Sequence, residues 1–113
     1  MSDTSPVLVI ATFATRDEAE RVGEALVEQR LAACGNVIPT IHSFYYWEGK
    51  LQRELEALLL LKSTRVHVAA IADYIQREGN AEMPEVVSVP VEGGLSGYLE
   101  WVAGQVDSKG PRS

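Results

Sequence analysis

The chain has 113 residues, 46% of them hydrophobic, which is enough to bury the core of one domain but short for two. Its net charge of -6 argues against a surface that follows nucleic-acid phosphates, and no apolar run approaches the roughly 20 residues of a membrane-spanning helix. We therefore expect a single domain over residues 1–113, with an ordered core from about 7 to 104 and with no nucleic-acid or membrane partner.

The chain ends and the cysteine content bear on its surroundings. Cys34 is the only cysteine, so no disulfide can form within the chain, and the first residues lack the basic and apolar segments of a secretory leader. This pattern predicts a cytoplasmic protein. The stretches Met1 to Pro6 and Asp107 to Ser113 are rich in Ser, Pro, Gly and charge, which predicts frayed tails.

The chain begins with a predicted strand and a predicted helix. The β-branched run Val7 to Ala11 is typical of a strand buried in a sheet. Thr15 followed three residues later by Glu18 predicts a capping box. Apolar residues then recur at helical spacing, so we expect a helix from about Arg16 to Ala33, with Gly35 as its stop.

A long hairpin follows. Asn36 to Trp47 predicts a long, bent strand with a bulge or an edge at Pro39, because proline has no amide hydrogen to donate to a ladder. The pair Glu48-Gly49 predicts a tight turn. The next strand alternates in polarity from Leu51 and then becomes the continuous apolar run Ala57 to Leu61, which predicts a half-exposed beginning and an end buried on both faces.

The second half repeats the order of helix and strand. Ser63 or Thr64 is expected to cap a helix over about Arg65 to Glu78, and Gly79 is expected to end it in a left-handed conformation.

The pattern then predicts a strand over Val86 to Val91 and a short last helix capped by Ser96. The order βαββαβ is that of the ferredoxin-like α+β fold, an antiparallel sheet with both helices on one face and, here, a short C-terminal helix. The other face would expose many apolar side chains, so we expect further copies of the chain to cover it.

Four segments resemble the CutA family of divalent-cation tolerance proteins. They are Leu31 to Pro39, Phe44 to Leu51, Pro84-Glu85 and Tyr98 to Trp101. The resemblance spans about Val7 to Val102 and implies a ferredoxin-like subunit in a tight homotrimer, similar in architecture to PII signalling proteins. It also implies a link to tolerance of copper and other divalent cations, without a catalytic activity.

The chain departs from that family where a copper site would be expected. Many members have a His-Pro-Tyr segment before the Pro-Glu pair, whereas this chain has Arg77 to Met83 there. Some bacterial members have a second cysteine late in the first strand, where this chain has Ala11. A copper site at those positions therefore cannot be carried over.

Four residues are the candidates for binding a divalent cation such as Cu or Zn. They are Cys34, His42, Glu82 and Glu85. Cys34 alone is better explained as a small buried thiol, because a soft-metal site needs further Cys or His ligands. His42 has no partner at metal-binding spacing within the chain, which favours a structural or solvated residue, but a trimer could bring three copies of it around an axis. For the two glutamates, a solvated acidic face or ion pairs between subunits is the better explanation.

The aromatic hairpin is the candidate interface or ligand cleft. Its residues, with one from the last helix, are Phe44, Tyr45, Tyr46, Trp47, Glu48, Lys50 and Trp101. Rings of this kind either anchor contacts between subunits or border a small-ligand cleft between them.

The chain contains no serine elbow, no Walker loop and no pairing of His with Ser or Cys that predicts an enzyme. We therefore expect a non-catalytic trimer that binds or responds to divalent metal ions. The alternative is a PII-like trimeric signalling or scaffold module that binds a small molecule or a protein at subunit interfaces.

Overall fold

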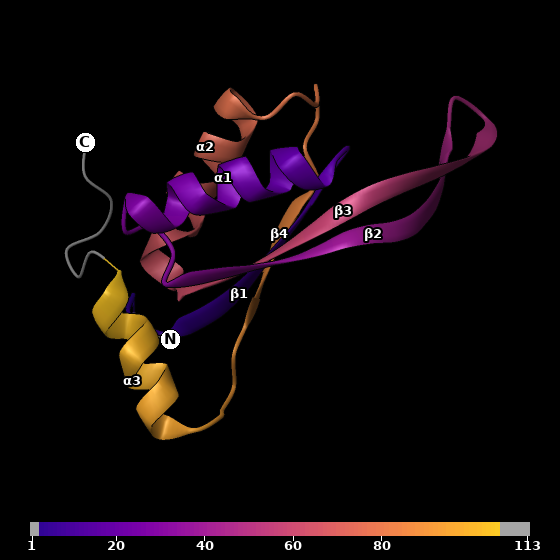
Figure 1. Ribbon diagram of the computed structural model, residues 1–113. Helices are drawn as coiled ribbons and strands as arrows, with labels where there is room; N and C mark the ends of the chain where they lie inside the picture. Colours follow the sequence, from indigo (N-terminus) through magenta and orange to yellow (C-terminus); the bar gives the residue numbers. More distant parts are fainter. Residues whose placement is uncertain (1–2, 107–113) are drawn as a thin grey trace.

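The computed structural model describes residues 3–106 of the chain as one antiparallel sheet with three helices (Figure 1). In chain order, the elements are β1 (Pro6–Phe13), α1 (Arg16–Glu28), β2 (Cys34–Trp47), β3 (Lys50–Thr64), a 3-10 turn (Arg65–His67), α2 (Val68–Glu78), β4 (Val86–Pro90) and α3 (Ser96–Gln105). The strands lie side by side in the order β2-β3-β1-β4. The ferredoxin-like βαββαβ arrangement with a short C-terminal helix is confirmed.

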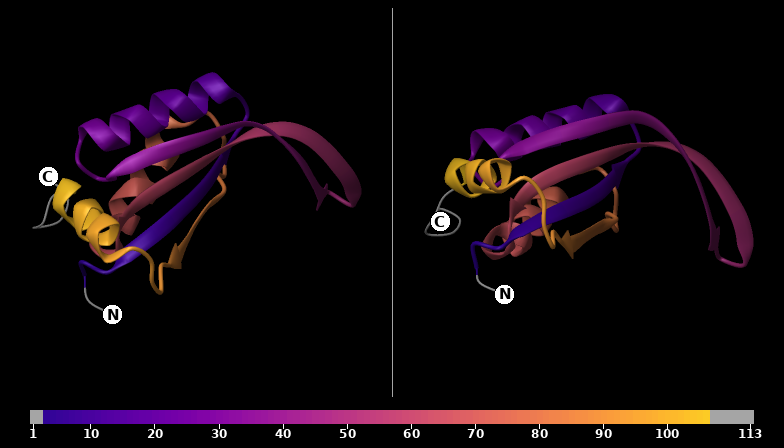
Figure 2. Two further views of the ribbon diagram at one scale, coloured as in Figure 1. Left: turned by 60° about the horizontal axis from the view of Figure 1, so that its bottom comes forward. Right: turned by 90° about the horizontal axis from the view of Figure 1, so that it is seen from below.

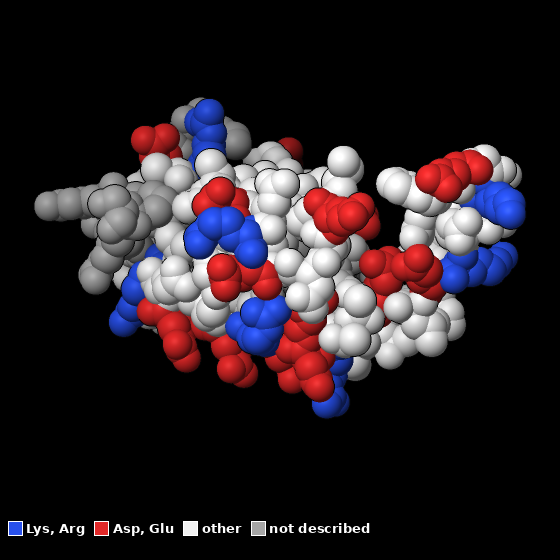
Figure 3. Space-filling view, turned by 90° about the horizontal axis from the view of Figure 1, so that it is seen from above, with Lys and Arg blue, Asp and Glu red and all other residues white. Residues whose placement is uncertain are grey.

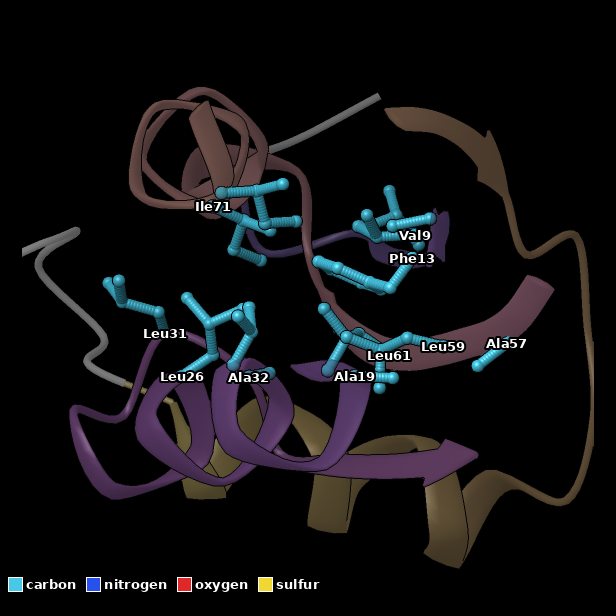
Figure 4. Close-up of a cluster of buried hydrophobic side chains, with 14 residues drawn as sticks. Val9, Phe13, Ala19, Leu26, Leu31, Ala32, Ala57, Leu59, Leu61 and Ile71 are labelled. Carbon is cyan, nitrogen blue, oxygen red and sulfur yellow. The ribbon is translucent and has the colours of Figure 1, made fainter. Parts of the chain in front are cut away.

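The core lies between the sheet and the two longer helices. Alternate residues of β1 and β3 are buried and pair across the ladder, such as Val9 with Leu61. Leu26 of α1 and Ile71 of α2 point at the same strand face and are fully buried (Figure 4). Both helices therefore cover one face of the sheet, as the sequence predicts.

Among residues 3–106, nothing comparable covers the opposite face of the sheet. Its side chains come from the positions between the buried ones, and they are half-buried or exposed: Leu8, Ile10, Ile38, Leu58, Leu60, Val87 and Val89. We call these residues the open face. The expectation that the apolar run Ala57 to Leu61 of β3 is buried on both faces is therefore wrong for a single chain, in which only alternate residues of this run are buried.

The end of α1 differs from the sequence prediction. The helix stops at Glu28 because Arg30 adopts a left-handed conformation, with φ of 62°. The chain then turns inward, and Leu31 becomes buried against the core. Gly35 is not the stop; it lies in β2, where an added Cβ would lie 3.2 Å from the side chain of Leu61.

The capping box at the start of α1 is only half formed. The hydroxyl of Thr15 accepts a hydrogen bond from the Glu18 amide at 3.1 Å, as expected. The Glu18 carboxylate does not return to Thr15; it accepts from the amide of Asn80 at 2.7 Å instead. Glu18 therefore ties α1 to the loop that follows α2.

The ends of α2 also differ from prediction. Thr64 makes no side-chain cap bond to the helix; its hydroxyl lies 2.8 Å from Nδ1 of the buried His67. Ser63 does not cap either, because its hydroxyl donates to the carbonyl of Leu31. Gly79 ends α2 in an extended conformation with φ of -83°, not a left-handed one. His67 is thus a structural residue of the core.

Both ends of the described chain bring corrections. α3 begins at Ser96 without a side-chain cap bond. The stretch before Val7 is not frayed throughout, because the carbonyls of Asp3 and Ser5 accept backbone hydrogen bonds from the turn after β3 and Pro6 belongs to β1. The predicted tail at 107–113 lies outside the described residues.

Candidate functional site

The hairpin of β2 and β3 extends well past the end of the sheet and curves away from the body (Figure 2). β1 pairs with β3 only as far as Ala57, so residues 41–56 form a two-stranded arm. The register shift between Ile38 and Ile41 lies at Pro39, as predicted. At the tip, Glu48 and Gly49 have φ of 51° and 80°, the pair of positive values that a type I′ turn requires.

Strand alternation divides the arm into two faces. Residues directly opposite in the ladder share a face, and Tyr46 pairs with Leu51. We call this the apolar face of the arm, and its apolar side chains are strongly exposed: Phe44 66%, Tyr46 75%, Leu51 53% and Leu55 62%. Arg53, opposite Phe44, lies on the same face, with its guanidinium carbon 5.6 Å from the centre of the Phe44 ring. His42 belongs to this face as well, because it pairs with Leu55.

The other face of the arm borders a cleft. Its residues Tyr45, Trp47, Gln52, Glu54 and Glu56 are the cleft face of the arm. Opposite them lie the loop 79–85 and the ends of β1 and α1, and the space between is about 710 Å³. Figure 3 shows this hollow between the arm and the body, with acidic side chains on both sides of it.

Two hydrogen bonds hold carboxylates in place in the cleft. The Tyr45 hydroxyl donates to Oε1 of Glu54 at 2.6 Å, and the Thr12 hydroxyl donates to Oε2 of Glu85 at 3.0 Å. The bond to Glu54, more than any other influence, raises the pKa of Tyr45 to about 12. The Tyr45 hydroxyl is therefore a fixed donor at neutral pH.

The metal-ligand candidates do not gather within one chain. Glu82 and Glu85 line the cleft, whereas Cys34 lies at the start of β2 and His42 is exposed on the arm. Throughout residues 3–106, no three Cys, His, Asp or Glu side chains are grouped so that they could hold a metal ion. Within the described part of one chain, these four candidates therefore do not form a joint site.

Cys34 contacts the last helix. Its Sγ lies 3.5 Å from the hydroxyl of Tyr98, and this hydrogen bond raises the pKa of Tyr98. The ring of Tyr98 stacks on Trp101 at 5.8 Å between centroids. Trp101 thus lies on α3, away from the arm in Figure 1, and does not line the cleft. Its predicted part in an interface stays a prediction.

Of the other hairpin candidates, Glu48 and Lys50 lie at the tip of the arm and do not line the cleft.

Sequence reasoning missed Thr12 and Glu18 as parts of the cleft. A Thr at the end of a strand and a Glu in the first turn of a helix carry no spacing pattern that would connect them, because the fold alone brings them to the loop 79–85.

Among the described helices, none has the length and apolar character to cross a bilayer.

The profile of the family described as "CutA1 divalent ion tolerance protein" matches residues 7–105. The chain is 38% identical to the divalent-cation tolerance protein CutA of Pectobacterium atrosepticum over 96 residues, which cover 85% of this chain and 87% of that one.

Plant proteins are similar too. The rice protein named "Protein CutA 1, chloroplastic" is 34% identical over 102 residues, 89% of this chain. The crystal structure of CutA1 from Oryza sativa superposes with a TM-score of 0.88 at 31% identity, covering 92% of this chain and 97% of that one. The matched region of this chain spans only 58% of the length of the rice chloroplastic protein.

Proposed function

This chain belongs to the CutA1 divalent ion tolerance family, and we propose that it serves cation tolerance as a non-catalytic homotrimer that binds divalent metal ions between subunits. The observation that carries the proposal is the apolar face of the arm. Four large apolar side chains, each more than half exposed, protrude there from a two-stranded ribbon that has no core of its own.

The open face of the sheet supports the same assembly. It adds a second apolar surface on the same subunit, and an obligate interface is the usual cover for surfaces of this kind. In the proposed trimer, the arm of one subunit packs its apolar face against the next subunit. Phe44 and Tyr46 are then the anchors, because buried aromatic rings dominate the free energy of association.

A metal site between subunits follows from the position of His42. It lies on the apolar face of the arm, so an arm that packs against a neighbour carries His42 into the interface. Copies of one imidazole from several subunits would provide the nitrogen ligands that Cu(II) and Zn(II) favour. Cys34, Glu82 and Glu85 remain weaker candidates, because each needs a partner from another subunit or from solvent.

Two measurements test the proposal. Sedimentation equilibrium at micromolar concentration is expected to give about 37 kDa, three times the 12.4 kDa chain, and a monomer would contradict the assembly. Calorimetric titration with Cu(II) or Zn(II) is expected to give a Kd tighter than about 1 mM, equivalent to about 4 kcal/mol. His42→Ala should weaken that binding; an unchanged copper affinity would remove His42 from the site.

The second candidate is a PII-like module that acts by binding a small molecule or a protein. The cleft beside the arm favours it, because its volume lies within the range of ordinary ligand sites. A trimer that binds neither Cu(II) nor Zn(II) more tightly than about 1 mM would favour this module over the metal-binding trimer.

The cysteine content predicts that the protein works in the cytoplasm. Fractionation of cells that express a tagged copy of the protein tests this prediction.

A further inference from the structure

The cleft between the arm and the loop 79–85 has walls of one sign of charge. The glutamates that line it are Glu18, Glu54, Glu56, Glu82 and Glu85. Its lining contains no Lys, Arg or His. A hollow lined by one sign of charge concentrates ions of the opposite sign, so the occupant that fits it carries positive charge.

Besides the polar Thr12, Gln52 and Asn80, much of the remaining lining is apolar or aromatic, which favours an organic cation over a bare metal ion. Trp47, 60% exposed, and Tyr45 stand on the arm, and Phe13 and Met83 line the cleft from the body. Aromatic rings attract ammonium and guanidinium groups, and apolar walls stabilise a hydrocarbon chain. The carboxylates are spread around about 710 Å³ and, within the described part of the chain, form no cluster that could hold a metal ion.

Glu18 points to a ligand independently. It is only 7% exposed, and it forms no ion pair with any described residue. Oε2 accepts from the Asn80 amide, and Oε1, to which no described residue donates, is not among the fully buried atoms and stays accessible at the cleft. A cation in the cleft would therefore meet a carboxylate that has no counter-cation among the described residues.

Two further carboxylates are oriented in advance. Glu54 is held by Tyr45 and Glu85 by Thr12, and each uses one oxygen for that bond. The second oxygen of each, like Oε1 of Glu18, is left for a donor from a ligand. A ligand with several N–H groups can therefore bind without first ordering these side chains.

We propose that this cleft binds a small organic amine, a hydrocarbon chain with one or more primary ammonium groups, through Glu18, Glu54 and Glu85 and the rings of the arm. The proposal goes beyond the metal-binding trimer. The cleft includes the cleft face of the arm and not its apolar face, but Thr12, Glu54 and Glu56 continue the alternation of the open face, so a subunit that covers the open face would border the cleft.

Calorimetry of the full chain with matched probes tests the proposal. 1,4-Diaminobutane is expected to bind one molecule per chain at least ten-fold more tightly than 1,4-butanediol, which has the same length but no charge. Succinate, the matched dianion, is expected not to bind. Equal affinity for the diamine and the diol, or binding of succinate, would overturn the proposal.

A pair of variants separates the cleft from general surface charge. Glu54→Gln keeps an acceptor for Tyr45 but removes the charge, and it should weaken diamine binding at least five-fold. Glu20→Gln removes one charge from an exposed residue of α1 that does not line the cleft, and it should leave the affinity unchanged. Equal weakening in both variants, or no weakening in Glu54→Gln, would overturn the proposal. The proposal would also be overturned if Zn(II) displaced the diamine from the wild type and did not bind Glu54→Gln, because the cleft would then be a metal site.

Discussion

The two faces of the arm come from the same two strands and the same turn, yet they differ in kind. The apolar face has Phe44, Tyr46 and two leucines and no cover among the described residues, whereas the cleft face combines rings with two carboxylates, one of which, that of Glu54, is already hydrogen-bonded. Four consecutive aromatic residues are therefore not one surface. A two-stranded ribbon has room for the proposed assembly surface and the proposed ligand surface at once, because neighbouring side chains of a strand point in opposite directions.

Removing the rings of the apolar face alone is expected to have the largest effect. In the double variant Phe44→Ser and Tyr46→Ser, each truncated ring is expected to cost the assembly about 2 kcal/mol or more. Sedimentation equilibrium should then show the mass of the single chain, 12.4 kDa, while far-ultraviolet circular dichroism keeps the α+β spectrum.

The matched control is Trp47→Ser, which removes a ring from the cleft face of the same hairpin. It should keep the trimer and lose diamine binding. If Trp47→Ser dissociates the trimer as completely as the double variant does, the division of the arm into two faces is wrong.

A comparison of two leucines on β3 sharpens the contrast between the arm and the body. Leu59 is 1% exposed in the core, and Leu59→Ala should lower the free energy of unfolding by about 2–5 kcal/mol at any protein concentration. Leu55 is on the apolar face of the arm, so Leu55→Ala should destabilise the protein only where subunits associate. Urea denaturation at two protein concentrations measures both; a concentration-independent loss in Leu55→Ala would contradict its place in an interface.

Much of this contrast is predictable from the sequence. The apolar runs predict the strands, Pro39 predicts the bulge, and Glu48-Gly49 predicts the turn, because each rests on local backbone chemistry. The strand order and the open face follow from the βαββαβ pattern, which a family resemblance reinforces.

The features that the sequence does not predict depend on tertiary contacts and not on local backbone chemistry. The sequence predicts a capping box at Glu18, but the loop after α2 competes for the carboxylate and binds it through the Asn80 amide. It predicts glycine stops, but Arg30 turns the chain after α1 because that turn buries Leu31. The cleft could not be predicted either, since it combines residues from the end of β1, α1, the arm and the loop 79–85, which only the tertiary fold brings together.

The tip of the arm offers a smaller perturbation that acts on both faces. Gly49 has φ of 80° with open space around it, so Gly49→Ala strains only the backbone and should cost about 1 kcal/mol in thermal unfolding. Gly93→Ala is the control, because that position also has open space but no positive φ. Equal stabilities of the two variants would contradict the I′ geometry of the turn.

The smallest expected effect concerns the ionisation of Tyr45 on the cleft face. An ordinary tyrosine ionises near 10.0, whereas the bond to Glu54 raises the pKa of Tyr45 to about 12. The neutral phenol is the form that the folded state favours. Its stabilisation is thus fully present below pH 10 and is lost as the pH rises toward about 12. At a pH of about 11, the 13C spectrum of labelled tyrosine should show Tyr45 still protonated while an unperturbed phenol is largely ionised.

Glu54→Gln should lower the pKa of Tyr45 more than Glu56→Gln, because Glu54 acts through a direct hydrogen bond and Glu56 only through its charge. Equal shifts in the two variants would mean that the acidity of the cleft as a whole, and not the held Glu54 carboxylate, sets the titration.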